Sequence, residues 1–542
     1  MQHAWRTVRL PFLLTSAVIA GACSDALPTG PGARADAGPA FSEMAAAAWD
    51  GQIRIGVVPT AASVTIGSAG DFTITNEGGD ALGSGAGGTV TVTTAGLPPV
   101  THWWLQVSCA FDPAGLPPLI AIADAHDVPW MTEPHPTVAC TRLLVGDRTG
   151  TDGGFTARNN YEAAMILIGL APADGSGFWH SRTVGETVYR FTLNGATVDS
   201  RTPVILTSST GLVTINGAPY RGAAVVVRNS AGSLAGVNKL WIEDYLLGVL
   251  PRELPPVPYD EIEAQKAQAV SARTYAIRGL GKRSVDGYDL LPTTSDQVYS
   301  GYAVEHPLST QAVRETEGIV ATYGGTLIEA LFSSTSGGFT AGNEEVYNSA
   351  PVPYLRPRTD AQRGASLEHA PDHAIFKYDK NASSLRGFKG GDYEADWSRY
   401  HRWTFTWTAD EISQVVSLHA QQPVGRVLAI NVLERGKSGR VQRIEYVTEA
   451  GTFYDAKDHI RTSLKFVNAS GTLSSLLSTL FYIDPVVDKA TGEVSGFVAY
   501  GGGWGHGVGL AQTGAVGMAE KGATYEEILK HYYTGIDLET RY

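Results

Sequence analysis

A stretch of fifteen residues, 501–515, contains seven glycines together with Trp504 and His506. Glycine is favoured where the backbone must take positive φ or where another group must come close. The stretch therefore predicts a loop that leads into a helix beginning near Val508 and running through Gln512 to Met518. Two interpretations remain open: the loop presents main-chain N–H groups and His506 to a ligand, or it is a tight turn with a structural histidine.

A second constrained segment surrounds Glu253, which lies between Pro251 and the pair Pro255–Pro256. Proline fixes φ, so these residues limit the directions in which the carboxylate can point. Apolar neighbours such as Leu254 favour a raised pKa, because burial disfavours the charged form, whereas Arg252 would lower the pKa unless its side chain points away. The alternative is a solvated surface carboxylate paired with Arg252.

The residues after Glu253 predict a helix, with Asp260 as its N-cap and Glu263 completing a capping box. Alanines recur along this helix at 264, 267, 269, 272 and 276, which indicates close packing. Gln265, Gln268 and Arg273 stand within this small-residue context. A plain surface helix would carry solvated charges there, so the three polar side chains point to a buried polar site.

The overall composition is that of a globular protein rich in turns and strands, with 43% hydrophobic and 18% charged residues, 62 glycines and 28 prolines. The net charge is −13, and no basic stripe accompanies it. A nucleic-acid partner is therefore not expected.

The first residues indicate export. Arg6 and Arg9 precede a short apolar run, and small residues lead to Cys23, as in a signal peptide with a bacterial lipobox. We expect residues 1–23 to be this signal, with Cys23 lipidated and anchoring the chain to a membrane; a simple cleavable signal is the alternative. The composition of residues 24–50 predicts a flexible linker. The other two cysteines, Cys109 and Cys140, are expected to form a disulfide in an exported protein.

The rest of the chain divides into three predicted regions, which together give an α+β, multi-domain protein. Residues 51–100 show short alternating runs that predict a small β region. Residues 101–190 predict a β-α-β-α-β module. Its "TRLLVG" followed by "FTARNNYEAAMILIGL" resembles the sporulation-related (SPOR) repeat, which implies binding of denuded glycan strands; an unrelated α+β packing domain is the alternative. Residues 191–542 predict a strand-rich core whose helices form a cleft.

Several segments in this last region resemble one family in the right order. "YLLGVLPRELP" and "EAQKAQAVSARTYA" are followed by "SDQVYSG", by "AVRETEGIVATYGGTLIEALFSSTSGGFTAGNEEVY" and by the glycine-dense stretch that opens this section. These segments resemble the core of the stage II sporulation protein D family, also called SpoIID/LytB. The resemblance implies a lytic transglycosylase of peptidoglycan that cleaves between N-acetylmuramic acid and N-acetylglucosamine, with Glu253 as the catalytic glutamate. It also implies peptidoglycan glycan strands as partners, together with an amidase, since the family includes amidase enhancers.

The chemistry of such an enzyme needs only one carboxylate. Most glycosidases use two, but here the primary hydroxyl of the muramic sugar replaces the attacking water. One glutamate protonates the leaving oxygen and then deprotonates that hydroxyl as it closes an anhydro ring, so its pKa must be raised. No cofactor is expected, and no metal, because the segment Thr293–Gln297 lacks the cysteines that help some family members bind zinc.

Further residues are candidates for substrate binding by matching motif. The predicted set comprises Gln265, Arg273, Tyr275, Gln297, Tyr299, Ser333, Ser334, Ser336, Gly337, Gly338, Trp504, Gly505, His506, Gly507 and Gln512.

Three other hypotheses about the function remain open. One is a non-catalytic enhancer that guides an amidase. Another is a hydrolase with Asp260 or Glu261 as a second carboxylate. The last is a serine hydrolase with Ser333 or Ser336 and His506, for which no third member of a triad is evident.

Overall fold

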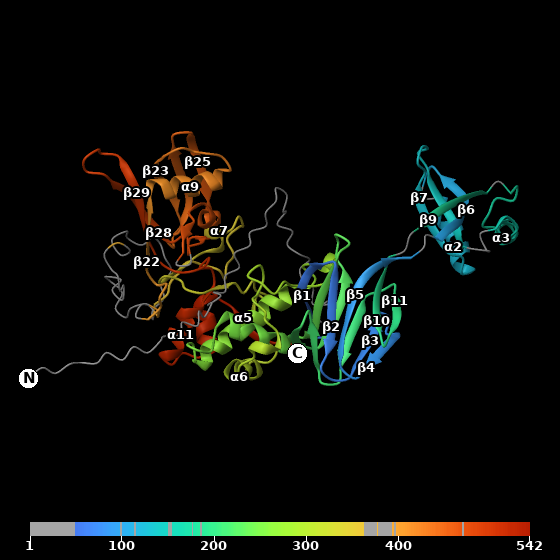
Figure 1. Ribbon diagram of the computed structural model, residues 1–542, viewed down its shortest axis with the longest axis horizontal. Coiled ribbons are helices and arrows are strands. Elements are labelled where there is room, and N and C mark those ends of the chain that lie inside the picture. Colours follow the sequence, from blue (N-terminus) through green and yellow to red (C-terminus); the bar gives the residue numbers. More distant parts are fainter. Residues whose placement is uncertain are drawn as a thin grey trace, which may run out of the picture. The chain divides into compact units, whose positions relative to one another are not determined.

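The computed structural model describes residues 49–97, 100–112, 115–149, 154–175, 177–184, 187–361, 377, 393–394, 397–468 and 471–542. Helices and strands are mixed, and the strands form several sheets, which confirms the predicted α+β, multi-domain class (Figure 1). The expected signal, Cys23 and nearly all of the expected linker lie outside the described residues. Within the described ranges, every helix is too short or too polar to span a bilayer.

The described residues form two compact units, the larger of which comprises those within 49–75, 83–89 and 205–542. Its first strands pair with strands that lie far along the sequence: in β1 and β16, Gln52 is opposite Trp241 and Ile55 opposite Asn238. The predicted β region at 51–100 is thus not a separate domain, and the expected boundary at residue 191 divides paired strands. In the order of pairing, these strands are β1 (Gln52–Ala61), β16 (Leu234–Trp241), β15 (Ala223–Arg228), β12 (Val204–Ser208) and β3 (Phe72–Asn76), and, in another sheet, β2 (Ser63–Ser68), β13 (Leu212–Ile215) and β14 (Ala218–Arg221).

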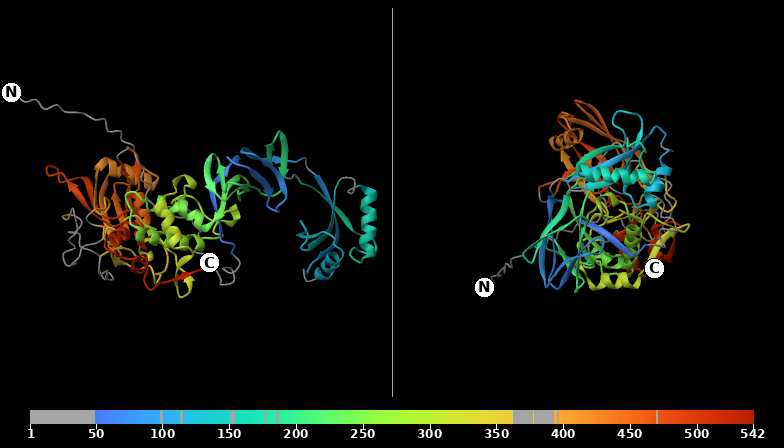
Figure 2. Two further views of the ribbon diagram at one scale, coloured as in Figure 1. Left: turned by 90° about the horizontal axis from the view of Figure 1, so that it is seen from below. Right: turned by 90° about the vertical axis from the view of Figure 1, so that its right-hand side faces the viewer.

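Helix α5 (Ile262–Arg278) is the central helix of this unit. One of its faces packs Ala264 and Ala267 into a core that includes residues of the C-terminal helices, and another packs Ala272 and Ala276 into a core with the helix before it. Small side chains let the neighbouring helices approach on both faces, as a helix buried all round requires. In both views of Figure 2, the C-terminal helices, drawn in red, lie next to α5 and the other helices drawn in green. The neighbours are α4 (Ile242–Glu253), α6 (Pro307–Glu315), α11 (Gln512–Glu520) and α12 (Tyr525–Tyr532).

The helix ends test three expectations. The spacing of Thr524 and Glu527 in the sequence predicts a capping box, and these two residues form one at the start of α12. The predicted cap of α5 is wrong: Glu261 is its N-cap residue and no side chain caps it, while Asp260 is exposed. Helix α11 begins at Gln512 instead of near Val508, because residues up to 511 pair as a short strand, β30 (Leu510–Ala511), with β19 (Phe332–Ser333).

The remainder of the larger unit is built from small sheets. One core cluster, which includes Trp407, Ile444 and Phe497, lies between two three-stranded sheets and α9 (Ala409–Ala420). The first sheet is β22 (Trp403–Thr408), β29 (Val494–Gly501) and β28 (Phe481–Val487), and the second is β23 (Val427–Arg435), β24 (Val441–Thr448) and β25 (Gly451–Ala456). Further elements are β17 (Ile319–Tyr323), β18 (Thr326–Leu327), β31 (Asp537–Thr540), β20 (Phe339–Thr340), β21 (Arg358–Thr359), β26 (Phe466–Val467), β27 (Leu473–Ser474), α7 (Asn343–Val346) and α10 (Ile460–Ser463).

The smaller unit comprises residues 76–82 and 90–204. Strands β5 (Gly88–Gly96), β10 (Thr187–Leu193) and β11 (Ala196–Ser200) are neighbours in one sheet. The division of the sequence into the two units falls within β4 (Ala81–Gly85). In the β5–β10 pair, Gly96 is opposite Thr187. The chain between these two residues therefore leaves one strand and returns to its antiparallel partner.

The chain between β5 and β10 folds as the small α+β module expected at 101–190. Its sheet has the order β7-β8-β6-β9, and its helices alternate with strands in the pattern β-α-β-β-α-β. The extra strand relative to the prediction is β7, which pairs with β8. The sulfur atoms of Cys109 and Cys140 are bonded, with 5.5 Å between the Cα atoms. The elements are β6 (Val100–Ala110), α2 (Pro117–Ala125), β7 (Trp130–Pro134), β8 (Thr141–Thr149), α3 (Phe155–Leu167) and β9 (Phe178–Val184).

Candidate active site

Glu253 is the last residue of α4, and its side chain is buried, with 4% of its surface exposed. Its Oε1 accepts a hydrogen bond of 2.6 Å from the main-chain N–H of Val298. Within the part of the chain that the structure describes, Oε2 has no hydrogen bond of normal geometry. One carboxyl oxygen is therefore held in place while the other is left for a proton.

Burial raises the pKa of Glu253 to about 8. The Val298 N–H, the side chain of Gln512 and the charge of Arg252 all lower it, in that order of importance, but burial outweighs them. The position at the C-terminal end of a helix adds to the cost of a negative charge. At neutral pH this carboxyl is mostly protonated, which is the state that a general acid needs.

Gln265 and Gln297 hold the two segments that meet at Glu253. Gln265 Nε2 donates to the carbonyl oxygens of Leu254 (2.8 Å) and Tyr259 (3.1 Å), which fixes the turn after Glu253. Gln297 Nε2 donates to the carbonyl of Ala272 at 3.2 Å, which fixes the residue before Val298. The sequence predicted that both side chains contact the substrate. In the structure both are fully buried, so they support the site instead.

Arg273 is also a structural residue, contrary to its predicted role in substrate binding. Its guanidinium forms a buried ion pair with Glu243, with two hydrogen bonds of 2.7 and 2.6 Å. The remaining N–H groups donate to the carbonyls of Val313 and Ile319 and to the Thr316 hydroxyl. All five N–H groups are thereby used inside the protein.

The two tyrosines predicted to bind substrate, Tyr275 and Tyr299, form their hydrogen bonds with residues other than Glu253. The buried Tyr299 donates to Asn238 Oδ1 at 2.7 Å and packs in the core beside α4. Tyr275 is partly exposed and donates to Asp296 Oδ1 at 3.3 Å. Tyr299 is thus a core residue, whereas Tyr275 retains an accessible face.

A pair of glutamine side chains connects α5 and α11 near the carboxyl. Gln512 Nε2 donates to Gln268 Oε1 at 3.4 Å, and the same Gln512 side chain lowers the pKa of Glu253. Gln268 is fully buried, and its Nε2 finds no acceptor among the described residues. Gln512 belongs to the predicted substrate-binding set, whereas Gln268 does not.

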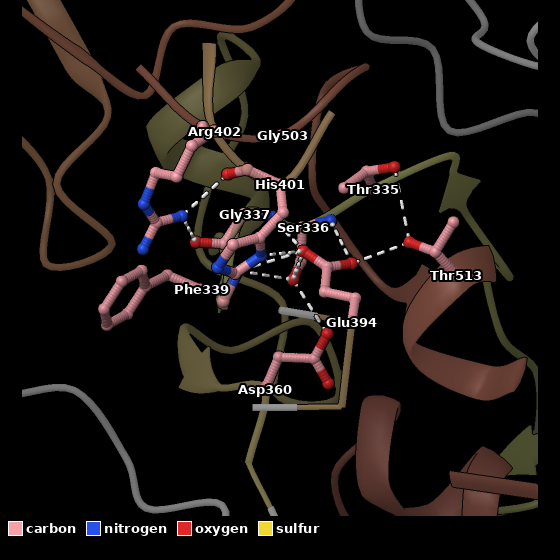
Figure 3. A network of polar contacts seen from close by, with 12 residues as sticks. Thr335, Ser336, Gly337, Phe339, Asp360, Glu394, His401, Arg402, Gly503 and Thr513 are labelled. Atoms are coloured by element: carbon pink, nitrogen blue, oxygen red, sulfur yellow. Dashed lines mark hydrogen bonds and ion pairs between the residues drawn. The ribbon is translucent and has the colours of Figure 1, made fainter. Parts of the chain in front are cut away.

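The predicted Ser–Gly segment at 333–338 surrounds a different carboxylate, Glu394 (Figure 3). Ser336 Oγ lies 2.8 Å from Asp360 Oδ2 and 3.2 Å from Glu394 Oε1, and the Gly337 N–H donates to Glu394 Oε1 at 2.6 Å. Thr513 Oγ1 and the His401 ring bond to the same carboxylate. Burial acts to raise the pKa of Glu394, but these hydrogen bonds outweigh it and lower the pKa.

This network removes several predicted residues from the substrate-binding set. The hydroxyl of Ser336 and the N–H groups of Gly337 and Gly338 are bonded to the network and buried. Ser333 is also buried, and its Oγ accepts from the Gly507 N–H at 3.1 Å. Ser334 alone of the three serines is partly exposed. Ser336 is paired with the carboxylates of Asp360 and Glu394, whereas the serine hydrolase interpretation expected it to be paired with His506.

The glycine-dense loop turns its main-chain N–H groups inward. Gly505 donates to the Leu477 carbonyl at 2.9 Å and Gly507 donates to Ser333 Oγ. Both have positive φ, 103° and 74°. A Cβ on Gly507 would lie 1.9 Å from Nη2 of the buried Arg440. The expected ligand-facing N–H groups are therefore absent at these two positions, and the glycines serve the tight packing of the loop.

His506 and Trp504 occupy opposite environments in this loop. His506 is 1% exposed, its Nδ1 accepts from the Val508 N–H at 3.0 Å, and its ring lies 5.9 Å from that of Tyr347. These contacts fit the structural interpretation of the histidine. Trp504 is partly exposed, with its ring 4.4 Å from that of Tyr400, so its role in substrate binding stays a prediction.

Sequence reasoning missed the Val298 N–H beside Glu253, and it counted Gln268 toward a buried polar site without assigning it to the substrate-binding set. A main-chain donor leaves no trace in residue identity, although Val298 lies within the "SDQVYSG" segment. The signal for Gln268 was available, since it stands among alanines in α5. Of the described residues, no three histidines, cysteines or acidic residues are grouped so as to hold a metal ion.

Comparisons with known proteins match the part of the chain that contains Glu253 and its neighbours. A family model described as "Stage II sporulation protein" matches residues 230–323, which include α4, α5 and Val298. A domain of unknown function, DUF8618, matches residues 341–509.

Relatives match more of the chain. An uncharacterized protein of Brachyspira hyodysenteriae is 32% identical over 326 residues, 60% of this chain and 73% of that protein. The amidase enhancer of Bacillus subtilis is 31% identical over 54% of this chain, which covers 40% of that protein. Stage II sporulation protein D of Bacillus subtilis is 29% identical over 64% of this chain and 87% of that protein.

Proposed function

This chain belongs to the stage II sporulation protein D family, and from that membership together with the environment of Glu253 we propose that it is an exported peptidoglycan lytic transglycosylase. A cell-wall-related function follows from the family. The finer activity that we propose is cleavage between N-acetylmuramic acid and N-acetylglucosamine in denuded glycan strands. The products carry anhydro-muramic ends.

The observation that carries the proposal is a buried carboxyl with a pKa of about 8, one oxygen of which has no hydrogen bond of normal geometry among the described residues. Glu253 Oε2 gives its proton to the glycosidic oxygen as the bond to the muramic C1 breaks. The resulting carboxylate is stabilised by the Val298 N–H on Oε1. It then takes the proton of the muramic primary hydroxyl, whose oxygen attacks C1. The proton is returned, no water is consumed, and one carboxyl suffices.

The test is a digest of denuded glycan strands, analysed by mass spectrometry for anhydro-muramic ends. The wild type is expected to produce them, and Glu253→Gln, which keeps the shape but not the proton, is expected to be slower by about two to four orders of magnitude. Reducing muramic ends would instead indicate hydrolysis with a second carboxylate, with Asp260 or Glu261 as candidates. Full activity of Glu253→Gln would refute the assignment.

A second candidate function is suggested by the relative named amidase enhancer. In this case the chain binds peptidoglycan and stimulates an amidase without cleaving glycan. Stimulation of a purified cell-wall amidase by wild type and Glu253→Gln alike, with no anhydro ends in either digest, would favour the enhancer.

The module between β5 and β10 is proposed to bind glycan independently of Glu253. Its β-α-β-β-α-β order supports the resemblance to the SPOR repeat. A chain lacking residues 101–184 is expected to bind denuded sacculi more weakly than the full chain in a pull-down. Equal retention of both chains would count against this role.

A further inference from the structure

We propose that Gln268 is a positioning residue for the reaction, which holds the Gln512 amide with its N–H side toward Glu253. This inference rests on the proposed function, because the group that is positioned is the proposed acid. Gln268 lies on α5, Gln512 is the first residue of α11 and Glu253 is the last residue of α4. Gln268 is hydrogen-bonded to Gln512, and Gln512 acts on Glu253, so these side chains link the three helices in that order.

The orientation of the Gln512 amide follows from its partner. Gln512 Nε2 donates one hydrogen to Gln268 Oε1 at 3.4 Å. An amide nitrogen carries two hydrogens. Because the Gln512 side chain lowers the pKa of Glu253 as a hydrogen-bond donor, we assign the second hydrogen to the Glu253 carboxyl. A Gln512 amide turned over would present its oxygen to Glu253 instead. An oxygen there would favour the protonated carboxyl, whereas the N–H group favours the ionised one.

The buried state of Gln268 supports a role of this kind. The side chain is fully buried, and in the described part of the chain its Nε2 has no acceptor. A buried donor without a partner is unfavourable for folding, and its replacement by an apolar side chain of similar shape is often neutral or stabilising. The fold therefore does not need an amide at this position, while the orientation of Gln512 does.

The positioning matters after the proton has left. Glu253 must be protonated to begin the reaction, and burial supplies that. Once the proton is on the leaving oxygen, the carboxylate is buried and charged, and a correctly oriented N–H group stabilises it without reorganisation. The other described groups that interact with this carboxyl are the Val298 N–H through a hydrogen bond, and Arg252 and Tyr245 through their charges.

The test is a double-mutant cycle on the titration of Glu253 itself. The pKa is followed by carbon NMR of glutamate labelled at the carboxyl, with the signal assigned by its absence in Glu253→Gln. Gln268→Leu is expected to raise the pKa of Glu253 by about one unit, because Gln512 is no longer held as a donor. Gln512→Leu is expected to raise it at least as much. In the Gln512→Leu background, Gln268→Leu is expected to add nothing, because its effect passes through Gln512.

A matched control is Gln297→Leu, the same change at another fully buried glutamine of the site. Its effect, whatever the size, is expected to be the same in the wild-type and Gln512→Leu backgrounds. If Gln268→Leu does not fold, Gln268→Met replaces it with an unbranched side chain. The inference is overturned if the Gln268 variants leave the pKa unchanged, or if their shift persists in full when Gln512 is absent. The digest reports separately on the proposed function, since the titration needs no cleavage.

Discussion

Replacing Glu253 by glutamine is expected to make the protein less active and, at neutral pH, more stable. The carboxyl has a pKa of about 8 in the folded protein against 4.5 in the reference state. Between these two values the unfolded chain loses the proton and the folded chain keeps it, so the stability of the wild type falls as pH rises. Below pH 4.5 both states are protonated and no difference arises.

The size of the effect follows from the pKa difference. Each pH unit in this window removes about 1.4 kcal/mol, so Glu253 costs the wild type on the order of 3 kcal/mol at pH 7. Glutamine keeps the shape and does not titrate, so Glu253→Gln avoids this cost. The stability advantage of Glu253→Gln over the wild type should therefore grow by about 3 kcal/mol between pH 4.5 and pH 7.

The assay is urea unfolding of both chains at several pH values in this range. Glu317→Gln, which removes an exposed carboxylate, is the control and should track the wild type throughout. A constant difference between Glu253→Gln and the wild type at all pH values would refute the reasoning. It would mean that Glu253 is already ionised in the folded protein and is no proton donor.

Three further predictions concern the loop, a helix cap and the anchor. Gly507→Ala should lower the melting temperature far more than Gly522→Ala, since both positions have positive φ but only at Gly507 does the new Cβ meet a side chain, that of Arg440; equal effects would show that Arg440 yields freely. Thr524→Ala should destabilise the protein by about 1 kcal/mol in urea unfolding, through loss of the α12 capping box, and an unchanged midpoint would contradict this. Cys23→Ser should release the protein from the membrane fraction on cell fractionation, and a variant that stays in the pellet would rule out lipid anchoring through Cys23.

The helices around the site were largely predictable, because local patterns set them. The alanine-rich run gave α5, and Thr524 with Glu527 gave the start of α12. The cap of α5 failed because a capping pattern records only that a side chain can reach the helix end. In the structure Asp260 is exposed and does not do so.

The pairing of strands was beyond the reach of such patterns. Alternation identified β1 as a strand, but nothing local shows that Ile53 pairs with Leu240. Long-range pairing depends on the whole set of competing strands, so the expected domain boundary at residue 191 fell within paired elements.

In the candidate site, the sequence predicted which residues are present and some of their properties, but not how their main-chain groups are oriented. Glu253 was identified with a raised pKa, because prolines and apolar neighbours are visible in the sequence. The direction of an N–H group is not visible there. Gly505 and Gly507 were expected to face a ligand and instead bond to Leu477 and Ser333 within the protein.

The pairing of Gly96 with Thr187 makes the module between β5 and β10 a detachable part of the chain. Its two attachment points are neighbours across an antiparallel ladder, where a two-residue turn such as Asn-Gly would join them. An evolutionary gain or loss of the module would thus leave the register of β5 and β10 intact. The same geometry would allow this module to be exchanged for another at the hairpin while the residues around Glu253 stay unchanged.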